Sequence, residues 1–364
     1  MNFATSLDLI LRGGALSLCA IIIVHMLRQK PVSIIGLICC VFNICAAGYI
    51  VYPLLFEAFE PVSAQTGLTA IGLNLTQFLG FMTVVTFWMF ARALATDHYR
   101  VGALEITVIV TTAIMFFPIC LVELPFAGTI KAIHIAYSLA LVADAMRVTF
   151  FNFRNDLVEN RRQLSKALLF IIPVTGAVIS GFVLLEALEM ENTVPKLLLS
   201  GAELATLFAF LLAISTLRES LLFVPETVKP INDAALTPAD RIELTRLRAL
   251  MQHGVFLEPN LTIGTLAAKM NMPEHRLRKL INNHLGHRNF AAFINDQRID
   301  EAKRRLGNGE LAREQITGLA FDLGFASLAP FNRAFRDRVG MSPSEYRTKA
   351  LTLAIAQDDH PLHS

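Results

Sequence analysis

The chain has 364 residues, of which 54% are hydrophobic and only 17% are charged. Soluble globular proteins carry about 25% charged residues, so this composition excludes an ordinary soluble protein and places part of the chain in lipid. The formal net charge is +2, but residues 237–350 hold 18 Lys and Arg against 12 Asp and Glu. The first 218 residues instead contain long runs with almost no charge. We therefore expect two regions that face different solvents, the second of them basic.

The cysteines indicate neither a disulfide framework nor a metal site. All five lie in apolar segments, which is typical of small buried hydrophobic residues: Cys19, Cys39, Cys40, Cys45 and Cys120. Leu18 before Cys19 is too bulky for a lipoprotein cleavage site, and Asp8 stands where a secretory signal has basic residues. The first apolar stretch is therefore expected to remain as a membrane span.

The apolar region contains seven stretches of membrane-spanning length. A hydrocarbon core of about 30 Å needs roughly 20 apolar residues in a helix. Stretches of this kind lie near residues 7–27, 32–56, 68–92, 102–122, 130–150, 166–188 and 196–217. Residues 1–218 are thus predicted to form an all-α domain of seven transmembrane helices.

The short loops between these spans predict the orientation, because cytoplasmic loops carry an excess of Lys and Arg. Every second connection is basic, and together these connections hold Arg28, Lys30, Arg92, Arg100, Arg147, Arg154, Arg161, Arg162, Lys166 and Arg218. The alternate connections hold Glu57, Glu60, Glu123, Glu186, Glu189 and Glu191, with only Lys131 and Lys196 near them. This asymmetry places the N-terminus outside and everything after Arg218 in the cytoplasm.

Four polar side chains within the spans are candidate ligand-binding residues, because such groups are costly in hydrocarbon. Asn74, Gln77, His134 and Glu203 come from three spans and fall in the outer half of the bilayer. They predict one pocket open to the outside, or else hydrogen bonds that hold helices together. Asp144 and Arg147 are spaced three residues apart and are expected to form a local ion pair.

The rest of the chain divides into a linker, a basic domain and a tail. Residues 219–236 contain Pro225 and Pro230 and lose the apolar pattern, which predicts a short, stiff linker. Residues 237–350 form the predicted basic domain, which opens with a helix at Thr237-Pro238. Residues 351–364 are expected to be a flexible tail.

Two helix-turn-helix patterns lie in this basic domain. In the first, Thr262 can cap a short helix, Asn271 can form the turn, and a second helix begins after Pro273 with Arg276, Arg278 and Lys279 on its outer face. In the second, Gly324 forms the turn and Ser327 caps a helix that buries Phe331 and Phe335. One amphipathic helix over residues 289–306 links the two motifs, and Ser342-Pro343-Ser344-Glu345 begins a closing helix.

Residues 261–347 resemble the DNA-binding domain of the AraC family. The resemblance is carried by FAAFINDQRIDEAKRRL in the linking helix and by ITGLAFDLGFASLAPFNRAFRDRVGMSPSEYR after it. It covers about a quarter of the chain and implies two recognition helices that enter successive major grooves. Transferred position by position, it predicts that the first recognition helix presents His275, Arg278 and Lys279 to DNA. The second would present Leu328, Ala329, Asn332 and Arg333 to bases, with Arg336 on DNA phosphates.

We therefore predict a membrane-embedded transcription regulator of the bacterial inner membrane, and no enzyme, cofactor or metal. The spans would act as a receptor for a small-molecule or physical signal; the alternatives are a passive tether and a transporter or intramembrane enzyme with an appended regulatory domain. The resemblance implies duplex DNA and RNA polymerase as partners, in addition to the lipid bilayer. It leaves open whether the chain acts alone or as a homodimer, and the sequence names neither signal nor operator.

Overall fold

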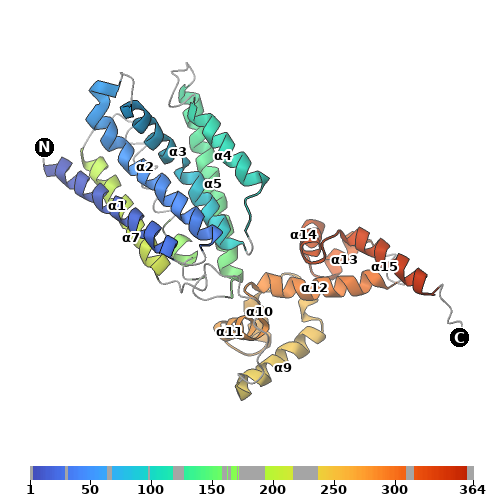
Figure 1. The fold of residues 1–364 in the computed structure, drawn as a ribbon. Helices are drawn as coiled ribbons and strands as arrows, with labels where there is room; N and C mark the ends of the chain where they lie inside the picture. The colour runs from blue at the N-terminus through green and yellow to red at the C-terminus, as the bar shows by residue number, and fades with distance from the viewer. Residues whose placement is uncertain are drawn as a thin grey trace. The chain divides into compact units, whose positions relative to one another are not determined.

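A computed structural model of the chain describes residues 3–28, 32–63, 68–96, 99–117, 127–157, 162, 165–169, 171, 193–215, 237–308 and 315–358. Across these residues the regular elements are helices, apart from a single isolated β-bridge between Asp156 and Asn289 (Figure 1). The all-α prediction is therefore confirmed for the described part of the chain.

The chain separates into two compact units. Unit 1 comprises Met1–Arg154 and Glu159–Pro225, and unit 2 comprises Asn155–Val158 and Glu226–Ser364. The boundary near residue 225 lies inside the predicted linker, residues 219–236, which falls outside the described residues. The presence of residues 155–158 in unit 2 was not expected from the sequence.

Unit 1 is a bundle of apolar helices. They are α1 (Phe3–Arg28), α2 (Ile34–Ser63), α3 (Leu68–Ala95), α4 (Ala103–Phe116), α5 (Ala127–Asn155) and α7 (Thr193–Ser215) (Figure 1). In the described residues, five of these helices contain segments long and apolar enough to cross a membrane: Phe3–Arg28, Ile34–Phe56, Ala70–Ala95, Ala132–Asn155 and Leu197–Ser215. These segments match five of the seven predicted spans.

The remaining two predicted spans are not fully described. Helix α4 covers the first part of the span expected at 102–122 and has 14 residues, while residues 118–126 lie outside the described ones. Of the span expected at 166–188, only residues 166–169 and 171 are described. The count of seven spans therefore stays a prediction.

Small residues let α2 and α3 approach closely. A Cβ atom added to Gly48 on α2 would lie 2.4 Å from the Leu79 Cβ, and one added to Gly80 on α3 would lie 3.1 Å from the Tyr49 Cα. Close backbone approach through small residues is the usual way in which helices pack in lipid, where apolar burial gives no advantage over contact with acyl chains.

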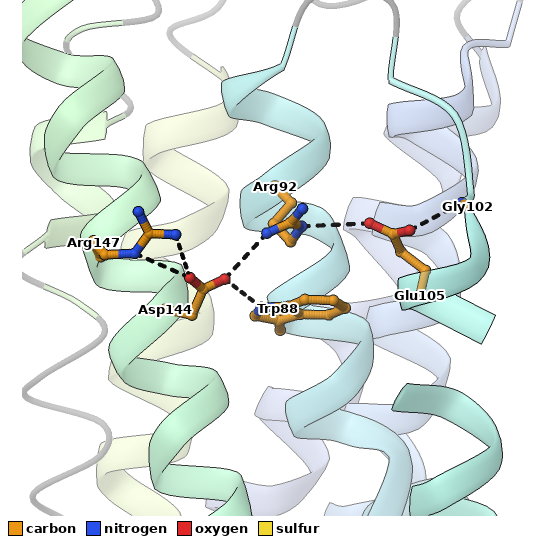
Figure 2. A network of polar contacts seen from close by, with 6 residues as sticks. All are labelled: Trp88, Arg92, Gly102, Glu105, Asp144 and Arg147. Carbon is orange, nitrogen blue, oxygen red and sulfur yellow. Dashed lines mark hydrogen bonds and ion pairs between the residues drawn. The ribbon is translucent and has the colours of Figure 1, made fainter. Parts of the chain in front are cut away.

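A polar network ties α3, α4 and α5 together (Figure 2). Asp144 on α5 accepts hydrogen bonds from Arg147 at 2.7 Å, from the Trp88 indole at 2.9 Å and from Arg92 at 3.2 Å. Glu105 on α4 lies 3.4 Å from the Arg92 Nε. The predicted local pair of Asp144 and Arg147 is confirmed, and it belongs to a larger network that fixes α5 against α3.

Unit 2 consists of short amphipathic helices. They are α9 (Pro238–Gln252), the 3₁₀ turn η3 (Val255–Leu257), α10 (Ile263–Lys269), α11 (Glu274–Leu285), α12 (Phe290–Gly307), α13 (Ile316–Asp322), α14 (Leu328–Val339) and α15 (Pro343–Asp358). One apolar cluster packs α9, α10 and α11 against the start of α12, and a second packs α13 and α14 against its end. The linking helix α12 thus belongs to both cores.

The helix boundaries of unit 2 follow the local signals in the sequence. Thr237 and Thr262 each accept a hydrogen bond from the backbone N–H three residues later, and Ser342 forms a reciprocal pair with Glu345. Helix α15 continues to Asp358, beyond residue 350, where we expected a tail to begin. Residues 351–358, LTLAIAQD, contain good helix formers and no Gly or Pro, so nothing ends the helix there.

Candidate functional site

The first helix-turn-helix motif is formed by α10 and α11. Its turn contains Asn271, whose φ of 52° is in the left-handed region that Asn tolerates. Pro273 occupies the N-cap position of α11 and makes no side-chain capping bond. Leu277 and Ile281 are fully buried, which directs the opposite side of α11 toward solvent.

The second motif is formed by α13 and α14, and its turn depends on Gly324. The φ of Gly324 is +82°, and a Cβ atom there would lie 2.5 Å from the Leu257 carbonyl oxygen, so no other residue fits. Phe331 and Phe335 are fully buried on α14, with ring centroids 5.7 Å apart. Ser327 occupies the N-cap position as predicted, although its side chain makes no capping hydrogen bond.

Arg298 on α12 connects the two motifs, and sequence reasoning missed it. Its guanidinium donates to the carbonyls of Phe256 at 2.7 Å and Glu258 at 2.9 Å, and it lies 5.2 Å from the ring centre of Phe325. Burial lowers the pKa of this guanidinium from 12.5 to about 10. The available signal was a basic residue directly beside the buried stripe of an amphipathic helix, next to Ile299.

The predicted reading residues of the second motif are accessible. Ala329, Arg333 and Arg336 are exposed along α14, and Leu328 and Asn332 are half-buried beside them. Because Phe331 and Phe335 hold the opposite side of this helix in the core, the exposed side can lie in a DNA groove.

The first motif differs at one predicted reading residue. His275 and Lys279 on α11 are exposed, but Arg278 is only 4% exposed. Its guanidinium donates to the Glu274 carboxylate one turn earlier and to the backbone carbonyl of Asp156. These assignments of base-reading residues stay predictions.

Asp156 belongs to a short stretch that we call the docked segment, residues 155–157. The N–H of Leu157 donates to the Arg288 carbonyl at 2.8 Å, and Asp156 forms the isolated antiparallel bridge with Asn289. Leu157 is 3% exposed and belongs to the apolar cluster of the first motif. The docked segment is therefore a packed part of unit 2.

The structure does not gather the four candidate ligand residues into one pocket. Glu203 lines a cavity of about 180 Å³ in unit 1, together with Phe42, Ile50, Val84, Phe87 and Phe210. Asn74 is exposed, Gln77 is half-buried, and His134 stacks on Phe81 with ring centroids 3.8 Å apart. None of these three is among the described residues that line the cavity.

Glu203 is chemically unusual in that cavity. Both carboxylate oxygens are buried without a hydrogen-bond partner in the described part of the chain. Nearby on α1, Asp8 and Arg12 form an ion pair at 3.0 Å, and Ser200 on α7 donates to Asp8. Sequence reasoning missed this pair as a candidate, although two opposite charges four residues apart within an apolar span are a visible signal.

Comparisons with known proteins agree with the geometry of unit 2. Residues 266–349 match the family model described as "Helix-turn-helix domain". The chain is also 29% identical to the arabinose operon regulatory protein of Escherichia coli (strain K12) over 140 residues, which is 38% of this chain and 45% of the relative. The chain thus spans less than half the length of that relative. No solved structure matches the chain.

Two helix-turn-helix motifs joined by one helix form a domain of a DNA-binding type. The domain is of the AraC type, as the resemblance of the sequence implied.

Proposed function

We propose that the protein is a one-component membrane receptor that couples a signal in or beyond the bilayer to promoter binding. The observation that carries the proposal is that the two parts are covalently joined. Helices long and apolar enough to span a membrane precede an AraC-type DNA-binding domain in one chain. The alternation of basic and acidic loops supports an orientation in which that domain lies on the cytoplasmic side of a bacterial inner membrane. A chain with this arrangement needs no separate messenger between sensor and promoter.

On the DNA side, Arg333 on α14 and Arg278 on α11 are the proposed base readers. Arg pairs bidentately with guanine in the major groove, and each such pair contributes about 1–3 kcal/mol of discrimination. Arg336 and Arg338 lie exposed near the end of α14 and are proposed to contact phosphates. The domain would act with RNA polymerase at the promoter, as a monomer or as a homodimer.

On the membrane side, the cavity beside Glu203 is the proposed sensing site. It is lined almost wholly by apolar side chains and has about the volume of an engineered cavity that holds benzene, roughly 150 Å³. A buried carboxylate without a hydrogen-bond partner favours an occupant that donates a hydrogen bond or carries a positive charge. The ligand class is therefore a small apolar molecule with a single hydroxyl or amine.

Reporter fusions test the orientation on which the proposal depends. A periplasm-active reporter fused after Glu189 should be active, and the same reporter fused after Leu236 should be silent, because the charge pattern predicts that these positions lie on opposite sides. The reverse pattern would put the DNA-binding domain outside the cell and would refute the proposed function.

A pair of arginine variants tests DNA reading by the full chain in lipid nanodiscs. Arg333→Ala should lower operator affinity by about 1–3 kcal/mol and relax the base preference at one position. Arg338→Ala should weaken binding to operator and random duplex alike, because a phosphate contact carries no sequence information. An equal, sequence-independent loss from both variants would exclude Arg333 as a base reader.

A passive tether is the second candidate for the spans, and the two candidates differ in one measurable respect. A receptor must bind its signal more tightly in one arrangement of the spans than in another, because equal affinity shifts no equilibrium. A tether gives the same promoter occupancy under every external condition, so a reporter scanned across small amines, alcohols and external pH separates the two.

A further inference from the structure

The docked segment covers the one predicted base reader of the first motif that is buried. Glu274 and His275 precede Arg278 by four and three residues on α11, so all three share one face of the helix. Glu274 and His275 are exposed, and so is Lys279 next to Arg278. That face of α11 is therefore a solvent-facing surface, and Arg278 is buried on it because the docked segment lies against it.

The docked segment is an addition to the DNA-binding domain. The family match covers residues 266–349 and so includes Arg278. Asp156 lies 122 residues before Arg278, outside that match. In sequence, the docked segment lies in the basic connection between the fifth and sixth predicted spans, directly at the end of α5. The domain type therefore does not require this contact, and the chain supplies it from a membrane helix.

Helix α5 also reaches the cavity that is the proposed sensing site. Val142 on α5 lines the cavity that Glu203 also lines. Asp144, two residues further along α5, forms an ion pair with Arg92 on α3 (Figure 2). Asn155 ends the same helix. A shift or rotation of α5 would be transmitted to residues 155–157 by chain continuity alone.

We propose that the docked segment is an autoinhibitory cover for the first recognition helix. While it is docked, Arg278 donates to Asp156 and Glu274 and does not read a base; when α5 moves, the segment leaves and the guanidinium turns to the major groove. The proposal rests on the proposed function, because it takes Arg278 as a base reader and α5 as part of the sensor.

The cover is weak enough to be switched. Its anchor is Leu157, and burying one Leu side chain corresponds to roughly a 10- to 100-fold bias of the docking equilibrium. A ligand that favours one arrangement of the spans by a similar factor is sufficient to reverse that bias.

Footprinting tests the cover on the full chain in lipid nanodiscs, with operator DNA selected from a random duplex library. In the unchanged protein, the half-site read by α14 should be protected at lower protein concentration than the half-site read by α11. Leu157→Asp should remove this difference by increasing protection of the α11 half-site about 10-fold or more. Leu157→Ile keeps the apolar anchor and should behave as the unchanged protein.

A reversible disulfide that holds the docked segment in place tests the cover without relying on the folding of Leu157→Asp. Residues that face each other in an antiparallel bridge have Cα atoms about 4.5–5.5 Å apart, within the range of a disulfide. The double variant Asp156→Cys, Asn289→Cys should lose protection of the α11 half-site when oxidised and regain it when reduced. The reduced form also controls for the lost Asn289 cap of α12.

The outcomes separate the two levels of the proposal. Equal protection of both half-sites in the unchanged protein, in Leu157→Asp and in the oxidised double variant would overturn the cover and leave DNA reading intact. Addition of Arg278→Ala to Leu157→Asp should abolish the protection gained at the α11 half-site, and unchanged protection would exclude Arg278 as the covered reader. Absence of protection at either half-site in every variant would instead refute the proposed function.

Discussion

Replacing Arg298 by Ala should destabilise unit 2 and loosen the connection between its two motifs. The Arg298 guanidinium donates to the carbonyls of Phe256 and Glu258, which precede the first motif, and it lies against Phe325 in the core of the second. The side chain is only 7% exposed, so water does not replace these contacts fully when it is removed.

The magnitude follows from three contributions. Hydrogen bonds from a charged donor are worth about 1.5–3 kcal/mol each, and the contact with Phe325 adds about 1 kcal/mol. Burial, which lowers the pKa of Arg298 from 12.5 to about 10, offsets roughly 3 kcal/mol at about 1.4 kcal/mol per pH unit. The net loss of unfolding free energy is expected to be about 1–4 kcal/mol, or roughly 5- to 1000-fold in the unfolded population.

Native-state hydrogen exchange of the full chain in nanodiscs measures this loss at the amides of α12 and α13. Arg338→Ala is the matched control, because its guanidinium is half exposed and pairs with Asp296 at 3.4 Å; it should cost less than about 1 kcal/mol. If exchange in Arg298→Ala remains within a factor of two of that in the control, the bridging role of Arg298 is wrong.

Three further predictions concern the turn, the pH dependence and the cavity. Gly324→Ala should lower the free energy of unfolding by at least about 2 kcal/mol, because its Cβ would meet the Leu257 carbonyl oxygen. Gly340→Ala, at φ +80° but with open space around it, should lower it by about 1 kcal/mol, and thermal unfolding compares the two variants. Burial lowers the pKa of His287 below its ordinary 6.5, while Asp296 raises it and Arg338 lowers it. As pH falls, His287 is therefore protonated in the unfolded chain before it is protonated in the folded chain, so unit 2 should lose stability below about pH 6.5. The loss should disappear in His287→Gln. Glu203→Gln should abolish the transcriptional response to an external amine or alcohol without changing protein level, and Thr206→Val, also at the cavity, should keep it; a normal response in Glu203→Gln would refute the site.

The features of unit 2 that could be predicted are those set by neighbours in the sequence. Capping by Thr262, the left-handed turn at Asn271 and the glycine turn at Gly324 each depend on a few adjacent residues. The burial of Phe331 and Phe335 follows from helical spacing alone. Local chemistry therefore determined both helix-turn-helix motifs and the exposed side of α14.

Two side chains show where such reasoning stops. The carbonyls that hold Arg298 lie 42 and 40 residues away, and the one that holds Arg278 lies 122 residues away. Helical periodicity assigned Arg278 to the outer face of α11 and gave no role to Arg298 on α12. Their burial is a tertiary contact that no local pattern encodes.

In unit 1, the length of the apolar stretches was informative and side-chain placement was not. Polar residues at similar depth in different spans were grouped into one pocket, but depth does not determine the direction in which a residue faces around its helix. Glu203 faces the cavity of unit 1, while His134 stacks on Phe81. Only the packing of the helices separates these two environments.

The unequal exposure of the two recognition helices explains how a short segment could control a promoter. Arg333 on α14 is exposed; if α14 reads DNA as proposed, the chain would stay on its operator through the second motif while Arg278 remains covered. Uncovering α11 then completes an intramolecular contact, for which the effective concentration is in the millimolar range. One regained Arg–guanine pair changes the free energy of binding by about 1–3 kcal/mol, which is roughly 5- to 150-fold in affinity. Moving residues 155–157 would therefore change promoter occupancy substantially without requiring the protein to leave the DNA or the membrane.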